Sequence, residues 1–211
     1  MFCSKIKLKE IEMKKKAILD EAKKIINKVG FKNAKMKDIA EKVGFSKASL
    51  YSYFKDKDEI AMNIFKEHLL KMFNKIKDLP EQKMTALEKF NEIKKLQIGF
   101  IKDGKNLMTI KPNLKELTKV HLEVFELRNK LFTVLKTIIE QGKKEKVYNT
   151  NIDVDQSIII LDSLITGIIF NASMRKNIKN DLIKTYDIEE MIGKAIDFFI
   201  LGITNTKTEL K

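Results

Sequence analysis

The chain has 211 residues, of which 44% are hydrophobic, so it can bury a sizeable core and is too apolar to be disordered. Only two prolines and eight glycines interrupt long runs rich in Lys, Glu, Ile and Leu, which favours an all-helical protein. A single cysteine, Cys3, excludes an internal disulfide and fits a cytoplasmic location, and no uninterrupted apolar run predicts a membrane span.

The net charge of +13 is unevenly distributed. Residues 1–60 contain 16 lysines and 9 acidic residues, whereas the other 151 residues contain 26 basic and 20 acidic residues. A basic segment of this kind attracts nucleic acid or an anionic membrane surface, but it also serves solubility alone. Charge by itself therefore leaves nucleic-acid binding, an anionic membrane surface and simple solubility as alternatives.

Three short helices are predicted at the N-terminus. The first has a broad apolar face between residues 14 and 29 and ends at Gly30, which can adopt the left-handed conformation that terminates helices. The second runs from residue 36 to 43 and stops at Gly44. Ser46 can cap a third helix that ends near Phe54.

Longer helices follow, and capping boxes mark where four of them begin. The boxes are Asp56–Glu59, Thr85–Glu88, Asp153–Gln156 and Asp187–Glu190. One more helix is predicted from Asn113 to Gln141, closed by Gly142. With no strand pattern or repeat, the prediction is an all-α protein with three parts: residues 1–56, a homeodomain-like three-helix unit; 57–79, a connecting helix; and 80–211, a helical bundle.

The second and third helices have the residues that a helix-turn-helix needs. A small residue, Ala40, lets the two helices approach, Gly44 permits the tight turn, and Leu50 packs the second helix of the motif back onto the first. At about 100° per residue, Leu50 and Phe54 share the core-facing side of the third helix. The opposite side, centred on Ala48 and Ser52, is then free to enter a major groove.

Residues 30–60, GFKNAKMKDIAEKVGFSKASLYSYFKDKDEI, resemble the DNA-binding domain of the TetR family of transcriptional regulators. The resemblance implies a homodimer that places one recognition helix per subunit in the major groove, and a C-terminal helical domain that binds a small molecule and dimerises. Two departures are Lys35, where the family often has Ser or Thr, and Ala48, where it often has Gly.

Ten residues are predicted to contact DNA, either at base edges or at backbone phosphates. Lys57, in the first turn of the fourth helix, is assigned to a phosphate because a cation there opposes its own helix dipole. The full set is Lys35, Lys37, Ser46, Lys47, Ala48, Ser49, Tyr51, Ser52, Tyr53 and Lys57.

The C-terminal part yields a predicted dimer interface and a predicted pocket. The helix from residue 153 has two apolar stripes, which implies burial on two sides and a bundle of two helices from each subunit. Interface candidates are Leu161, Leu164, Gly167, Ile168, Ile192, Ile196 and Phe199. Pocket candidates are Phe90, Gln97, Phe100, His121, Phe125 and Phe170, although each is more often an ordinary core residue.

The predicted function is a transcriptional regulator, most simply a repressor that binds a palindromic operator as a dimer and is released by a largely apolar effector. Two alternatives stay open: a ligand-independent DNA-binding or architectural factor, and an all-helical enzyme or lipid carrier. The sequence contains no P-loop, nucleophile elbow or catalytic pair, and its two histidines and one cysteine predict no metal site or cofactor.

Overall fold

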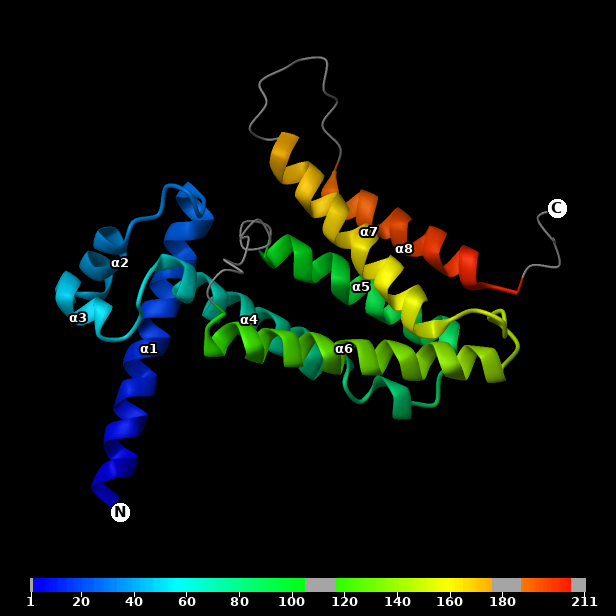
Figure 1. Cartoon of the computed structure of the whole chain (residues 1–211), viewed down its shortest axis with the longest axis horizontal. Helices are drawn as coiled ribbons and strands as arrows, with labels where there is room; N and C mark the ends of the chain where they lie inside the picture. The colour runs from blue at the N-terminus through cyan, green and yellow to red at the C-terminus, as the bar shows by residue number, and fades with distance from the viewer. Residues whose placement is uncertain (1, 105–116, 176–186, 206–211) are drawn as a thin grey trace. The chain divides into compact units, whose positions relative to one another are not determined.

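The protein is built from helices. The computed structural model describes residues 2–104, 117–175 and 187–205, and within these ranges it has no β-strand, only an isolated bridge between Tyr148 and Thr204. The predicted all-α class is confirmed. The elements are α1 (Phe2–Val29), α2 (Met36–Val43), α3 (Lys47–Tyr51), α4 (Lys57–Ile76), the 3-10 turn η1 (Leu79–Glu81), α5 (Ala86–Gly104), α6 (Lys119–Lys144), α7 (Val154–Arg175) and α8 (Ile188–Ile203) (Figure 1).

The chain forms two compact units, each discontinuous in sequence. The first, which we call the head, combines Met1–His68 with Gly104–Phe125, and the second, the bundle, combines Leu69–Asp103 with Glu126–Lys211. The division falls inside α4 and inside α6, so each of these helices contributes its first turns to the head. The predicted boundaries, at 56–57 and 79–80, remain a prediction.

Two glycines and a serine form the turns of the head, as predicted. Gly30 follows α1 with φ of 81° and Gly44 follows α2 with φ of 77°, a region that disfavours residues with a Cβ. The Ser46 hydroxyl accepts a hydrogen bond of 3.0 Å from the Ser49 N–H and so caps α3.

The recognition helix α3 is shorter than predicted. It ends at Tyr51, and the N–H groups of Tyr53 and Phe54 both donate to the Leu50 carbonyl at 3.1 Å. Such shared bonds are common where a helix tightens at its end. The turn still directs Phe54 inward, so its predicted burial is confirmed although it lies outside the helix.

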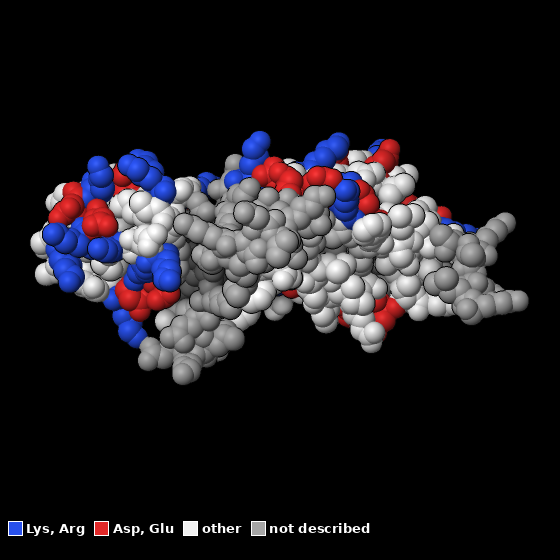
Figure 2. All heavy atoms as spheres, turned by 90° about the horizontal axis from the view of Figure 1, so that it is seen from above, with Lys and Arg blue, Asp and Glu red and all other residues white. Residues whose placement is uncertain are grey.

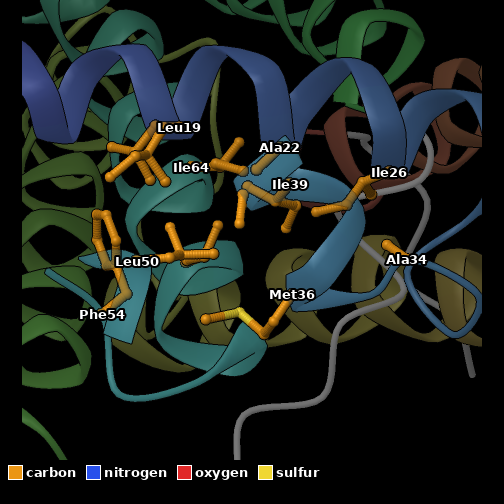
Figure 3. Packing of buried hydrophobic residues seen from close by; sticks show 12 residues of the cluster. Leu19, Ala22, Ile26, Ala34, Met36, Ile39, Leu50, Phe54 and Ile64 are labelled. Carbon is orange, nitrogen blue, oxygen red and sulfur yellow. The ribbon is translucent and has the colours of Figure 1, made fainter. Parts of the chain in front are cut away.

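Apolar side chains from four helices meet in the core of the head. Figure 3 shows Leu19, Ala22 and Ile26 of α1 pointing toward Ile39 and Leu50. Because α4 also contributes, it starts as part of the head core and not as a free connector. The buried cluster comprises Ile18, Leu19, Ala22, Ile26, Ala34, Met36, Ile39, Ala40, Leu50, Phe54, Ile60 and Ile64.

The four predicted capping boxes all form their N-terminal hydrogen bond. The donor–acceptor distances are 2.8 Å for Glu59 to Asp56, 3.3 Å for Glu88 to Thr85, 3.0 Å for Gln156 to Asp153 and 2.9 Å for Glu190 to Asp187. These bonds fix where α4, α5, α7 and α8 begin.

The start of α6 differs from the prediction. The predicted first residue, Asn113, lies outside the described residues, and the described helix begins at Lys119 after the non-helical Thr118. The Thr118 N–H donates to Nδ1 of His121 at 3.2 Å, which gives α6 a side-chain cap that the capping-box pattern does not reveal.

Gly142 does not end α6, contrary to the prediction. The helix continues to Lys144, and Lys146 provides the positive φ of 59°. Any Cβ at Gly142 would overlap the buried ring of Tyr148, which packs edge-on to Phe90 at 6.1 Å. Gly142 therefore allows the Tyr148 ring to lie close to α6, and it does not end the helix.

The α7 helix is buried on one side only. Val154, Ile158 and Leu161 are buried, whereas the opposite side exposes apolar residues including Ile160 and Leu164. The sequence was predicted to contain no segment that could cross a membrane. By length and composition alone, however, residues 154–172 are long and apolar enough to do so. This helix nevertheless carries Asp162, which is ion-paired with Arg128 of α6 at 2.5 Å.

Candidate DNA-binding site

The exposed side of α3 is polar and lies opposite its buried anchor. Ala48, Ser49, Tyr51 and Ser52 are exposed, whereas Leu50 is fully buried. The predicted division of this helix into a core side and a solvent side is thus confirmed at the level of burial. Small residues around one protruding aromatic ring allow close approach to the floor of a major groove.

The hydroxyl groups on this side have defined roles. Ser46 Oγ donates to Ser49 Oγ at 3.1 Å, and Ser52 Oγ donates to the Ser49 carbonyl at 2.7 Å. The Ser49 hydroxyl acts as acceptor in that pair, so its own proton can be donated to DNA. The Lys47 ammonium lies 5.8 Å from the Tyr51 ring centroid, a cation–π contact that keeps both groups on one edge of the helix.

Tyr53 is more deeply integrated in the head than its predicted role suggests. Its ring stacks on Phe45 with centroids 5.9 Å apart and packs against the head core. The ring is therefore a packing group, and a phosphate contact remains a prediction for the hydroxyl alone.

Lys57 has contacts within the head that the sequence did not predict. Its ammonium donates to the carbonyl of Phe31 at 2.8 Å and to that of Lys32 at 3.3 Å, and it lies 4.5 Å from the Phe31 ring centroid. These carbonyls follow the C-terminus of α1, where the helix dipole favours a cation. Lys57 thus ties the start of α4 to the segment after α1, and its contact with a phosphate remains a prediction.

The first turn of α2 presents two lysines. Lys35 is the residue before α2 and makes no side-chain cap, as its identity predicts, and it is exposed. Lys37 is also exposed and lies 3.6 Å from Glu41. In Figure 2, blue lysine side chains are numerous on the part of the head formed by α2 and α3, with red acidic side chains among them. This arrangement suits the phosphate backbone that flanks a groove.

Two lysines of α1 also lie beside the recognition segment, and sequence reasoning missed them. The Lys15 ammonium lies 5.7 Å from the Phe54 ring centroid. Lys14 interacts electrostatically with Tyr53, and its hydrogen bond with Glu10 raises the pKa of its ammonium. The helical period of the apolar residues in α1 could have indicated the position of Lys15, because Lys15 precedes the buried Ile18 by about one helical turn.

The six pocket candidates fall in different environments and different units. His121 and Phe125 belong to the head, and the other four belong to the bundle. Phe90 is fully buried and packs on Phe199 with ring centroids 5.9 Å apart. Gln97 and Phe100 are half-buried, whereas Phe125 and Phe170 are exposed. A shared pocket remains a prediction.

Four of the predicted interface residues need correction. Leu161, Ile192, Ile196 and Phe199 are buried within the subunit, so their side chains are not available to a partner. They belong to the sides of α7 and α8 that pack inside the bundle, and the prediction merged both apolar stripes of α7 into one interface.

The remaining interface candidates keep part of their surface free. Leu164 is 42% exposed, and Gly167 and Ile168 are half-buried. The predicted set also omitted Phe198 and Leu201 of α8, which are 70% and 62% exposed. In Figure 2 the surface over α7 and α8 is largely uncharged.

A capped recognition helix, a glycine turn and a lysine-rich surface define a helix-turn-helix DNA-binding regulator. Residues 18–63 match the family model for bacterial regulatory proteins of the tetR family. The head therefore contains a DNA-binding domain similar to that of the tetR family.

Similarity to individual proteins extends beyond the head. The fatty acid metabolism regulator protein of Bacillus subtilis (strain 168) is 22% identical over 198 residues, which cover 94% of this chain and 100% of that protein. The structure of FadR from Bacillus subtilis in complex with stearoyl-CoA is similar with a TM-score of 0.67 and 19% identity, over 89% of this chain and 98% of the other. A Saccharomonospora viridis protein bound to choline has a TM-score of 0.67 and 20% identity, over 91% and 98%.

Proposed function

We propose that this protein is a cytoplasmic, dimeric transcriptional repressor that leaves a palindromic operator when it binds a long-chain fatty acyl-CoA. The observation that carries the effector class is the full-length similarity to a fatty acid metabolism regulator. A related structure of the same fold contains stearoyl-CoA, a ligand with a long apolar chain and a polar head. Both agree with the expectation of a largely apolar effector.

DNA recognition is proposed to use the exposed side of α3 for base edges and the surrounding lysines for phosphates. The candidates are Ser49 and Tyr51 at the groove, and Lys35, Lys37 and Lys47 at the backbone, with Lys15 added by the structure. The described head residues contain no arginine, so the bidentate arginine contact to guanine is not available from them. Specificity then rests on hydroxyl, methyl and lysine contacts together with DNA shape.

Dimerisation is proposed to use the exposed apolar side of α7 and α8. Ile160, Leu164, Phe198 and Leu201 all expose large apolar surfaces, which soluble monomers rarely gather. Gly167 supports this proposal because a Cβ there would meet nothing within 4 Å in its own subunit. A glycine inside a helix is otherwise destabilising by about 1 kcal/mol relative to alanine.

The alternatives differ in what they require. A ligand-independent DNA-binding factor would bind the operator equally well with and without effector. An enzyme or lipid carrier would not need an operator, and the relatives named above are regulators. The choline-bound structure of the same fold makes a different effector the main rival within the regulator class.

The test is operator selection followed by effector titration. Sequences retained by the full-length protein from a random DNA pool should contain inverted repeats, with half-sites spaced by about one helical turn. Stearoyl-CoA should then lower the affinity for the selected operator by roughly tenfold or more, measured by fluorescence anisotropy. If choline weakens DNA binding and stearoyl-CoA does not, the proposed effector class is wrong.

A further inference from the structure

A buried histidine in the first turn of α6 carries a polar atom without a partner. His121 is 5% exposed, and its Nε2 is one of two buried side-chain atoms in the described chain that lack a hydrogen bond. Buried polar groups in native proteins are nearly always paired with protein, water or ligand. An unpaired atom of this kind therefore marks a place where something else binds.

The other ring nitrogen of His121 determines what Nε2 can do. The backbone N–H of Thr118 donates to Nδ1 at 3.2 Å, and the Thr118 hydroxyl lies 2.7 Å from the same atom. A backbone N–H can only donate, so Nδ1 must offer its lone pair. In the neutral ring the proton then resides on Nε2. The unpaired atom is thus an N–H donor held in a fixed orientation.

Apolar surface lies beside this donor on the same helix. Phe125 is one turn further along α6, on the same side as His121, and is 44% exposed. Leu122 is exposed as well. A buried donor on a helix turn that also carries these apolar side chains would suit a ligand in which an acceptor oxygen adjoins a hydrocarbon chain.

The same turn of α6 is connected to the DNA-binding helices. Glu123, two residues after His121, accepts a 2.7 Å hydrogen bond from Lys66 of α4. The neighbouring Glu67 accepts a 2.9 Å hydrogen bond from Lys16 of α1. His121 belongs to the head together with these groups, so a ligand held by it touches the body that carries α3.

We propose that the Nε2–H of His121 donates a hydrogen bond to the acyl carbonyl oxygen of the effector, and so selects ligands with an oxygen at the junction of chain and head group. This inference rests on the proposed function. The carbonyl oxygen can belong to a thioester or to a free fatty acid, since both place an acceptor at the end of the chain.

Two substitutions separate the two nitrogen atoms. His121→Asn keeps an acceptor near the position of Nδ1 for Thr118 and removes the donor at Nε2. His121→Gln reaches the position of Nε2 with an amide N–H and gives up the contact with Thr118. The full-length variants are titrated by calorimetry with stearoyl-CoA, with stearate, and with S-octadecyl-CoA, a thioether that lacks the carbonyl oxygen.

We expect His121→Asn to weaken stearoyl-CoA binding about tenfold, which corresponds to about 1.4 kcal/mol, and His121→Gln to stay within about threefold of the wild type. Binding of S-octadecyl-CoA should be equal in the wild type and His121→Asn. The unliganded His121→Asn protein should keep its melting temperature, because the contact with Thr118 is retained.

Equal stearoyl-CoA affinity in the wild type and His121→Asn would overturn the inference and leave the effector proposal intact, with Nε2 holding only a water molecule. Equal weakening of stearoyl-CoA and S-octadecyl-CoA would also overturn it, because the contact would then not involve the carbonyl. Stearate binding that exceeds stearoyl-CoA binding and falls in His121→Asn would support the contact and assign the oxygen to a free acid. A wild type that binds none of the three ligands would refute the effector proposal itself.

Discussion

Replacing Lys57 with methionine separates two roles that one cation could have. Methionine keeps most of the aliphatic stem and removes the ammonium that contacts the carbonyls of Phe31 and Lys32. If these contacts are the role of Lys57, the variant loses stability. If the cation instead binds a phosphate, the variant loses salt-sensitive DNA affinity.

The expected loss of stability follows from the geometry. A hydrogen bond to a charged group contributes about 1.5–3 kcal/mol, and a cation–π contact at an exposed site about 0.5–1 kcal/mol. The bond to Phe31 is short at 2.8 Å, whereas the one to Lys32 is long at 3.3 Å. Because Lys57 is partly exposed and water replaces some of these contacts, we expect a loss of about 2 kcal/mol, or about 4–8 °C in Tm.

The matched control is Lys47→Met on the exposed face of α3. Thermal unfolding is followed by circular dichroism, and operator affinity is measured across a salt series. Lys57→Met should lower Tm and leave the slope of log K against log salt unchanged. Lys47→Met should keep Tm and reduce the slope by about 0.9, the effect of one lost phosphate contact. The reasoning is refuted if Lys57→Met keeps Tm and reduces the slope instead.

Three further experiments test the core, the interface and an ion pair. Leu50→Ala should destabilise the head by about 2–5 kcal/mol, whereas Tyr51→Ala should weaken operator binding at unchanged Tm; equal Tm losses would contradict the assigned faces. Leu164→Glu should give monomers by sedimentation while Thr150→Glu, in an exposed loop, stays dimeric; a dimeric Leu164→Glu would move the interface elsewhere. The hydrogen bond from Lys66 of α4 holds the pKa of Glu123 below its ordinary value of 4.5. The stability that this ion pair contributes is therefore fully present above pH 4.5 and is lost as the pH falls through the lower pKa of the folded state. Glu123→Gln should therefore reduce the fall in Tm between neutral pH and pH 3–4, and an unchanged fall would show that the pair adds nothing.

The features that the sequence predicts well are local in the chain. Capping bonds such as Thr85 with Glu88 join residues three apart, and Gly44 needs only its own backbone angle. Burial of Leu50 follows from the angular period of one helix. Each of these is settled within one or two turns, so no knowledge of the tertiary fold is required.

The features that the sequence predicts poorly depend on contacts with residues elsewhere in the chain. Lys57 was assigned to DNA because a cation in the first turn opposes the helix dipole. Its contacts with Phe31 and Lys32, which lie 26 and 25 residues away, become visible only in the folded chain. Gly142 was predicted to end a helix because glycine is common at helix C-termini. The ring of Tyr148 comes close to it only once the following loop turns back. In each case the residue type indicated a special role and only the fold showed which one.

Reciprocal coupling between operator and effector is the prediction that joins the two proposed activities. A ligand can change operator affinity only if it binds the DNA-binding state and the released state with different affinity. A hundredfold loss of operator affinity requires about 2.7 kcal/mol of coupling. The same coupling obliges operator DNA to weaken stearoyl-CoA binding by the same factor, which calorimetry with and without the selected operator can measure. Equal stearoyl-CoA affinities in both conditions would mean that the acyl chain binds without controlling the repressor.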